Sequence, residues 1–114
     1  MNIQVFARNK CFDSKKTQRY FKERNIKISY LDLGERKISK GELSSLVQAL
    51  GNIDKLVDEK AKNQKAYLQY KYCTEGNKFS FLLENQDILK TPIVRSKNKA
   101  VVGYNPKEWE KWGE

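Results

Sequence analysis

The sequence contains no histidine, and this absence removes several kinds of active site. Ser-His-Asp triads and Cys-His nucleophile pairs both need an imidazole, as do His-ligated metal sites. The two cysteines, Cys11 and Cys73, are too few for a four-thiolate zinc site within one chain. We therefore expect no bound metal and no other bound cofactor. Any thiol chemistry has to be activated by lysines, arginines or a helix terminus.

Long apolar runs are also missing. No stretch approaches the roughly 20 apolar residues that cross a bilayer, and Met1 leads into a short alternating segment instead of the apolar region of a signal peptide. We therefore expect a cytosolic protein with no membrane partner. Structural disulfides are rare in the cytosol, so both cysteines are interpreted first as thiols.

The charge is strongly unbalanced, with 23 Lys and Arg against 14 Asp and Glu and a net charge of +9. Such an excess can reflect an anionic partner such as nucleic acid. The lysines are spread along the chain, however, without a dense basic tail or a nucleic-acid recognition motif. We interpret the excess as a solvated surface and expect no direct contact with nucleic acid.

The N-terminal third has the pattern of a β-α-β unit. Alternation of apolar and polar residues predicts strands over 2–7 and 26–32, and helical spacing predicts a helix over 12–25 between them, which Asn25 ends. Two strands joined by a helix favour parallel pairing with a right-handed crossover.

The C-terminal part has the pattern of a hairpin followed by a helix. Short apolar runs over 92–95 and 100–104 flank a turn at 96–99, which predicts an antiparallel pair. Asn105 then suits an N-cap, and Pro106 suits the first position of a terminal helix.

The middle of the chain is predicted to be helical. Ser39 and Glu42 form a capping box that opens a helix, and Gly51 ends it. Further helical stretches are predicted over 53–57, 63–73 and 78–89, with a break at Gly76.

The whole pattern predicts an α/β fold of the thioredoxin-like type. At 114 residues the chain is long enough for one compact domain, 1–114, and too short for two. Its order is β-α-β, a helical insertion over about 36–90, then β-β-α. This order corresponds to a four-stranded mixed sheet with helices packed around it.

Cys11 is the most specific feature, because it follows a strand and a short loop and directly precedes a helix. The unpaired amides and the positive end of the helix dipole at that point stabilise a thiolate. Lys10, Lys15 and Lys16 add positive charge nearby, and such surroundings lower the pKa of a cysteine. The alternative is a half-buried cysteine that fills space. A strand-to-helix turn favours the reactive thiol.

Segments in three regions of the chain, in order, resemble the ArsC/Spx family of thioredoxin-like proteins. They are NKCFDSKKT (residues 9–17), VDEKAK (57–62), and KTPIVR (90–95) followed by GYN (103–105). The resemblance covers essentially the whole chain. It implies that Cys11 is the nucleophile and that the peptide bond before Pro92 is cis and lies opposite Cys11. Without the resemblance, Pro92 would be an ordinary trans proline that starts an edge strand.

Ser14 stands where Spx and many redox relatives carry the second cysteine of a Cys-x-x-Cys pair. ArsC also has a serine there, so the resemblance implies monothiol chemistry. The Ser14 hydroxyl could donate to the Cys11 thiolate, or it could simply occupy the first turn of the helix.

The arginines that bind the oxyanion in ArsC are not matched. This chain offers Lys60 at the first position, Thr91 at the second and no arginine near Tyr104, while Arg95 does not align with the three. Lysine does not replace the bidentate fork of arginine. Efficient arsenate reduction is therefore not expected.

Two functions from different classes remain open. The first is a monothiol reductase in which Cys11 attacks a small thiol or disulfide substrate and glutathione or a similar thiol completes the cycle. Cys73 is then either a buried structural cysteine or a resolving thiol. The candidate substrate- or thiol-binding residues are Lys10, Lys15, Lys60, Thr91, Pro92 and Arg95.

The second function is that of a Spx-like transcriptional regulator that binds RNA polymerase. The missing second cysteine disfavours it, and the chain stops at Glu114, before the longer C-terminal segment of Spx. We favour the reductase and expect a monomer.

Overall fold

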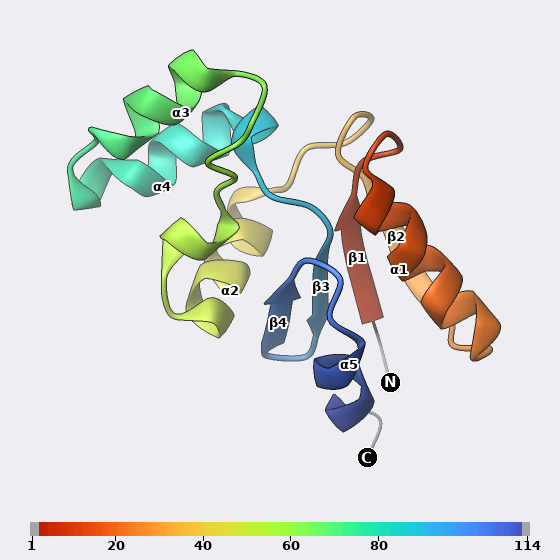
Figure 1. Ribbon diagram of the computed structural model, residues 1–114. Helices are drawn as coiled ribbons and strands as arrows, with labels where there is room; N and C mark the ends of the chain where they lie inside the picture. The colour runs from red at the N-terminus through yellow and green to blue at the C-terminus, as the bar shows by residue number, and fades with distance from the viewer. Residues whose placement is uncertain (1–2, 113–114) are drawn as a thin grey trace. The chain divides into compact units, whose positions relative to one another are not determined.

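Two compact units make up the chain in the computed structural model, which describes residues 3–112 (Figure 1). The first unit combines the residues up to Arg36 with those from Thr91 onward, and the second runs from Lys37 to Lys90. Asn2, where the first strand was predicted to start, lies outside the described residues.

The first unit contains a four-stranded mixed sheet with the strand order β2-β1-β3-β4. Strand β1 (Ile3–Ala7) pairs in parallel with β2 (Ile28–Asp32) and antiparallel with β3 (Ile93–Ser96). Strand β3 pairs antiparallel with β4 (Lys99–Val102). The thioredoxin-like α/β fold, with its parallel β-α-β unit and C-terminal hairpin, is therefore confirmed.

Helices α1 (Phe12–Glu23) and α5 (Pro106–Trp112) pack against one side of this sheet. The Phe21 ring lies 5.1 Å from the Trp109 ring, between their centroids, and is 1% exposed. Helix α1 ends as predicted, because Asn25 takes a left-handed backbone conformation with φ of 56°. The core on this side consists of Ile3, Val5, Ala7, Tyr20, Phe21, Val94 and Trp109.

The second unit consists of helices and 3₁₀ turns. They are α2 (Lys40–Leu50), η1 (Ile53–Leu56), α3 (Gln64–Lys71), α4 (Glu75–Glu84) and η2 (Gln86–Ile88). The predicted capping box is present: the Ser39 hydroxyl accepts from the Glu42 amide at 3.2 Å, and the Glu42 carboxylate accepts from the Ser39 amide at 2.9 Å. Gly51 ends α2 with a φ of 80°.

The predicted break at Gly76 is wrong, because Gly76 lies in the first turn of α4. The chain turns earlier, between Tyr72 and Thr74, and Thr74 adopts the extended backbone of an N-cap. The Asn77 amide donates to the Thr74 carbonyl at 2.9 Å. Glycine is tolerated in the first turn of a helix when an N-cap residue before it starts the helix. Gly76 therefore does not interrupt α4, which Thr74 starts.

Gln86 holds the start and the end of the second unit together. Its side-chain oxygen accepts from the Ile38 amide at 2.8 Å, and its side-chain nitrogen donates to the Ile38 carbonyl at 2.8 Å. Both groups are buried, so these bonds satisfy backbone polar groups that water does not reach. Within residues 3–112 there is no helix with the length and apolar character needed to cross a membrane.

Candidate functional site

Cys11 lies at the carboxyl end of β1, one residue before α1. A tight turn places it there, since its amide donates to the Arg8 carbonyl at 3.0 Å. Cys11 takes the N-cap position with an extended backbone, and its carbonyl accepts from the Lys15 amide at 3.2 Å. The side chain is half-buried and forms no disulfide. The thiol therefore points to the end of α1 where amide N–H groups have no partner within the helix.

The pKa of the Cys11 thiol is lowered. Burial alone would raise this pKa, but hydrogen bonds to the thiolate outweigh it. The donors are the hydroxyls of Ser14 and Thr91, followed by the backbone amides of Ser14 and Asp13. The expected contribution of lysine charge is not among these causes. Hydrogen bonding, not lysine charge, is therefore what lowers the pKa of Cys11, and a lower pKa increases the thiolate fraction at neutral pH.

Ser14 is fully buried in the first turn of α1. Its hydroxyl oxygen accepts from the Arg8 amide at 3.4 Å. Hydrogen bonding from the Ser14 side chain is among the causes of the lowered pKa of Cys11. Ser14 therefore lies in the first turn of the helix, and its role in stabilising the thiolate during a reaction stays a prediction.

Thr91 and Pro92 lie beside Cys11 although they are about 80 residues away in sequence. The Thr91–Pro92 peptide bond is cis, as the resemblance implied. The Cys11 Sγ lies 3.6 Å from the Thr91 carbonyl oxygen and donates to it. The Pro92 carbonyl accepts from the Gly103 amide at 2.7 Å, which fixes the segment against the end of β4. Cys11, Ser14, Thr91 and Pro92 therefore form one site.

Tyr30 also belongs to the surroundings of this site, and sequence reasoning missed it. Burial raises the pKa of its phenol, and the negative charges of Asp32 and of the Cys11 thiolate raise it further. Strand β2 runs parallel to β1, so its last residues lie at the same edge of the sheet as Cys11. The one signal in the sequence that could have indicated Tyr30 is its place, with Asp32, in the second half of a strand predicted to be parallel to the strand before Cys11.

The other candidate residues of the first unit do not contact the thiol. Lys10 and Lys15 are exposed. The Arg95 guanidinium donates to the side-chain oxygen of Gln4, its neighbour on β1, through both Nε and Nη2. It also lies over the Phe6 ring, 5.8 Å from the centroid. Arg95 is thus held on the sheet near the opposite end of β1 from Cys11.

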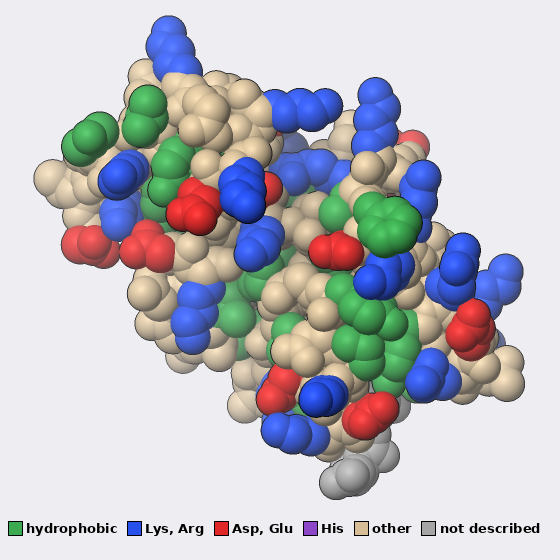
Figure 2. Space-filling view, viewed as in Figure 1, with side chains coloured by type: hydrophobic (Ala, Val, Ile, Leu, Met, Phe, Trp, Pro, Cys, Tyr) green, Lys and Arg blue, Asp and Glu red, His purple; other side chains and the backbone are tan. Residues whose placement is uncertain are grey.

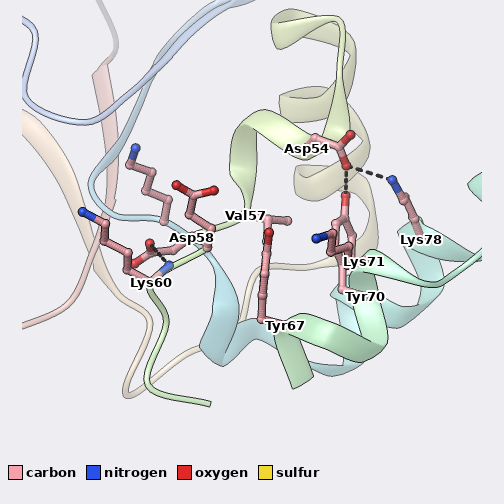
Figure 3. Close-up of a pocket in the computed structure, with 10 residues that line it drawn as sticks. Asp54, Val57, Asp58, Lys60, Tyr67, Tyr70, Lys71 and Lys78 are labelled. Carbon is pink, nitrogen blue, oxygen red and sulfur yellow. Dashed lines mark hydrogen bonds and ion pairs between the residues drawn. The ribbon is translucent and has the colours of Figure 1, made fainter. Parts of the chain in front are cut away.

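Lys60 lies in the second unit, on the rim of a cavity of about 530 Å³. Figure 3 shows Tyr67 standing in this cavity, with Lys60 on one side and Tyr70 and Lys71 on the other. Lys60 is exposed, and its backbone amide donates to the Asp58 carboxylate at 2.9 Å.

Cys73 is also in the second unit, in the turn that follows α3. Its amide donates to the Tyr70 carbonyl at 3.0 Å. The side chain is half-buried and forms no disulfide, so the expectation of a buried cysteine holds only in part. Its role as a resolving thiol stays a prediction.

Comparison with known proteins gives the family. The model of the ArsC family matches residues 6–112. The chain belongs to the ArsC family. Among solved structures it is similar to an ArsC family related protein from Bacteroides fragilis, with 23% identity, a TM-score of 0.82 and 97% of each chain covered.

The fold of this ArsC-family chain is likewise shared with an arsenate reductase from Vibrio cholerae, at 21% identity, a TM-score of 0.82 and 97% coverage of each chain. A third similar structure, described as an arsenate reductase from Yersinia pestis, has 20% identity and a TM-score of 0.80, covering 96% of this chain and 98% of the other. No curated protein matches the sequence.

A second polar cluster of this ArsC-family chain was also missed by sequence reasoning. In the second unit, Asp54 accepts from the Tyr70 hydroxyl at 2.6 Å and from the Lys78 ammonium at 3.1 Å. These bonds lower the pKa of Asp54, the Tyr70 bond most, although burial opposes the change. Lys78 also pairs with Glu75 at 3.2 Å. The cluster joins η1, α3 and α4, which indicates a structural role.

Residues 3–112 contain no group of three or more Cys, Asp or Glu side chains placed to hold an ion.

Proposed function

We propose that the protein is a monothiol oxidoreductase of the ArsC type, with Cys11 as nucleophile and glutathione or a similar small thiol as reductant. The observation that supports this most is the hydrogen bonding at Cys11. Two hydroxyls and two amides surround its sulfur and lower the pKa of the thiol. A thiolate is the form that attacks disulfides. The protein would act in the cytoplasm as a monomer, with no bound cofactor.

The proposed reaction is thiol–disulfide exchange. The Cys11 thiolate attacks one sulfur of a substrate disulfide, so a Cys11 S–S bond forms and the substrate S–S bond breaks. The leaving sulfur takes the electron pair and then a proton from water. A glutathione thiolate next attacks the mixed disulfide and releases the Cys11 thiolate. Ser14 and Thr91 would stabilise that thiolate as leaving group, because their hydroxyls donate to it.

Arsenate is a poor candidate substrate for this site. The group before Pro92 is the neutral Thr91, and Arg95 is already bound to Gln4. A tetrahedral oxyanion calls for charged, bidentate donors, which these residues do not supply. We expect negligible turnover of arsenate with glutathione. Robust turnover by the purified protein would show that another cation completes an oxyanion site.

The test is the reaction with oxidised glutathione, followed by mass spectrometry of the intact protein. Wild-type protein and the Cys73→Ser variant should both gain one glutathione, and the adduct should disappear when reduced glutathione is added. Cys11→Ser should gain none under the same conditions. The proposal fails if wild type stays unmodified, or if the adduct forms on Cys73.

The same sample can address the regulatory alternative. A Spx-like regulator would bind purified RNA polymerase whether or not Cys11 turns over. Binding to the polymerase together with an unreactive Cys11 would favour the regulator over the reductase.

A further inference from the structure

More than half of the net positive charge of the chain lies in the segment that contains Cys11. Between residues 8 and 24 there are seven basic side chains and two acidic ones, a difference of +5 out of the +9 of the whole chain. Figure 2 shows several Lys and Arg side chains over α1, while others lie over the second unit. The seven are Arg8, Lys10, Lys15, Lys16, Arg19, Lys22 and Arg24.

An exposed aromatic ring lies next to the thiol within this basic face. Phe12 follows Cys11 directly and is 74% exposed. The Lys16 ammonium lies 5.7 Å from the centroid of the Phe12 ring and 4.3 Å from that of Tyr104. Cation–π contacts of this kind hold the ammonium at a fixed place on the surface. The residue that follows Cys11 in the chain thus presents an exposed apolar ring, and a positive charge is positioned over that ring.

A hollow of about 340 Å³ continues this surface along α1. Lys16, Arg19 and Arg24 line it, together with Tyr20 and Tyr104. The Arg24 guanidinium stacks on the Tyr20 ring at 3.8 Å and donates to the Tyr20 carbonyl at 3.4 Å. Glu23 is the one acidic residue of the lining, and none of the three cations forms an ion pair with an acidic side chain among residues 3–112.

We propose that this basic face selects an acidic, disulfide-bearing polypeptide as the partner of Cys11. The inference rests on the proposed function and names its substrate class. Phe12 would contact apolar atoms next to the disulfide, while Lys16, Arg19 and Arg24 would contact carboxylates of the partner. Unpaired cations beside a hollow attract carboxylates and raise the rate of productive encounter.

The exchange with such a partner follows the same chemistry. The Cys11 thiolate attacks the cysteine sulfur of the polypeptide, a Cys11–polypeptide S–S bond forms, and the other sulfur of the original disulfide leaves with the electron pair. Charge on the partner does not change this step. It changes how often the disulfide reaches Cys11, so the effect should appear in the second-order rate constant and weaken with salt.

The test uses three synthetic peptides that differ only in charge. Each carries one cysteine as a mixed disulfide with thionitrobenzoate, flanked by four Glu, four Gln or four Lys residues. Release of the coloured thiolate reports attack by Cys11 in the Cys73→Ser variant. At low salt we expect the Glu peptide to react about tenfold faster than the Lys peptide, with the Gln peptide between them. At about 1 M salt the three rates should converge.

Charge variants locate the effect on the surface. Lys16→Gln and Arg19→Gln should each reduce the Glu-to-Lys rate ratio severalfold. Lys99→Gln is the matched control, because Lys99 is exposed at the start of β4, the edge strand at the opposite end of the strand order from β2, and does not line the hollow. Its rate ratio should equal that of the parent.

The outcomes separate the two proposals. Equal rates for the three peptides at low salt would overturn the acidic-partner inference and leave the oxidoreductase intact, as would a Lys99→Gln effect as large as that of Arg19→Gln. Failure of all three peptides to react would instead refute the proposed function.

Discussion

Each of the two units carries one cysteine next to a helix, but the two occupy different positions relative to it. In the first unit Cys11 is itself the N-cap of α1, where amide N–H groups have no partner within the helix. In the second unit Cys73 lies in the turn between α3 and α4, and Thr74, not Cys73, is the N-cap of α4. The hydrogen bonds that lower the pKa of Cys11 come from its own helix turn and from Thr91. The N-cap position and the donors around it, not the presence of a thiol, therefore determine which cysteine is suited to chemistry.

The units also differ in how the cations near their aromatic rings are partnered. In the first, Lys16 and Arg24 lie over tyrosine rings and keep their charge available at the surface. In the second, the Lys78 ammonium is paired with Asp54 and Glu75. Pairing fixes helices to one another, whereas unpaired charge can act on a partner.

The largest effect is expected in the aromatic core of the first unit. Phe21→Ala should lower the free energy of unfolding by about 3–5 kcal/mol, because it leaves a cavity between α1 and α5. Phe12→Ala is the matched control, since Phe12 is 74% exposed, and should change stability by no more than about 0.5 kcal/mol. Urea denaturation followed by tryptophan fluorescence measures both. Similar losses for the two variants would contradict the assignment of the core.

The next effect concerns the two thiols. At pH 7 Cys11 should react with iodoacetamide about tenfold faster than Cys73, because hydrogen bonds from Ser14, Thr91 and Asp13 lower the pKa of Cys11. Single Cys11→Ser and Cys73→Ser variants isolate each rate. The rate of Cys11 plotted against pH should have its midpoint below the ordinary cysteine pKa of about 8.5. A midpoint at or above that value would contradict the role given to the N-cap position of Cys11.

A smaller effect is expected when a single donor to Cys11 is removed. Ser14→Ala and Thr91→Val should each raise the pKa of Cys11, because each removes a hydroxyl that stabilises the thiolate. The alkylation profile should then shift to higher pH and the rate at pH 7 should fall. Ser45→Ala, on the exposed side of α2, is the control and should leave the profile unchanged. If the alkylation profiles of both site variants were unchanged, the backbone amides alone would stabilise the thiolate.

The smallest effect concerns the polar cluster of the second unit. The bond from Tyr70 lowers the pKa of Asp54 in the folded protein, so the ionised carboxylate stabilises the fold above its unfolded pKa of about 3.9. This contribution is lost as the pH falls through the lower, folded pKa. Asp54 is half-exposed, so water screens the interaction. The stability difference between wild type and Asp54→Asn should shrink from pH 7 to pH 2. If that stability difference did not depend on pH, ionisation of Asp54 would not contribute to the stability of the fold.

Much of the fold could be predicted because its signals are local. The capping box at Ser39, the left-handed Asn25 and the Asn105-Pro106 helix start are each encoded within a few residues. Gly76 misled the prediction because glycine marks a helix end or a tolerated first-turn position depending on its neighbours. Local pattern alone did not distinguish the two.

Part of the candidate site could likewise be predicted from local sequence, and part could not. That Cys11 starts a helix after a strand was evident from the sequence by itself, and so was Ser14 in the first turn. Only the tertiary structure decided that Tyr30 lies within reach of the Cys11 charge and that Arg95 is held by Gln4. These depend on which strands become neighbours and in what register.

The sequence by itself determined the order of strands and helices, the position of a thiol at a helix N-terminus and the excess of positive charge. Periodicity and capping act between residues a few positions apart, so they can be recognised directly in the sequence. The tertiary structure decided which groups stabilise that thiol, since the Thr91 hydroxyl comes from 80 residues further along the chain. It also decided that Lys16 and Arg24 would rest on Tyr104 and Tyr20. Such contacts arise only when the sheet and its helices pack.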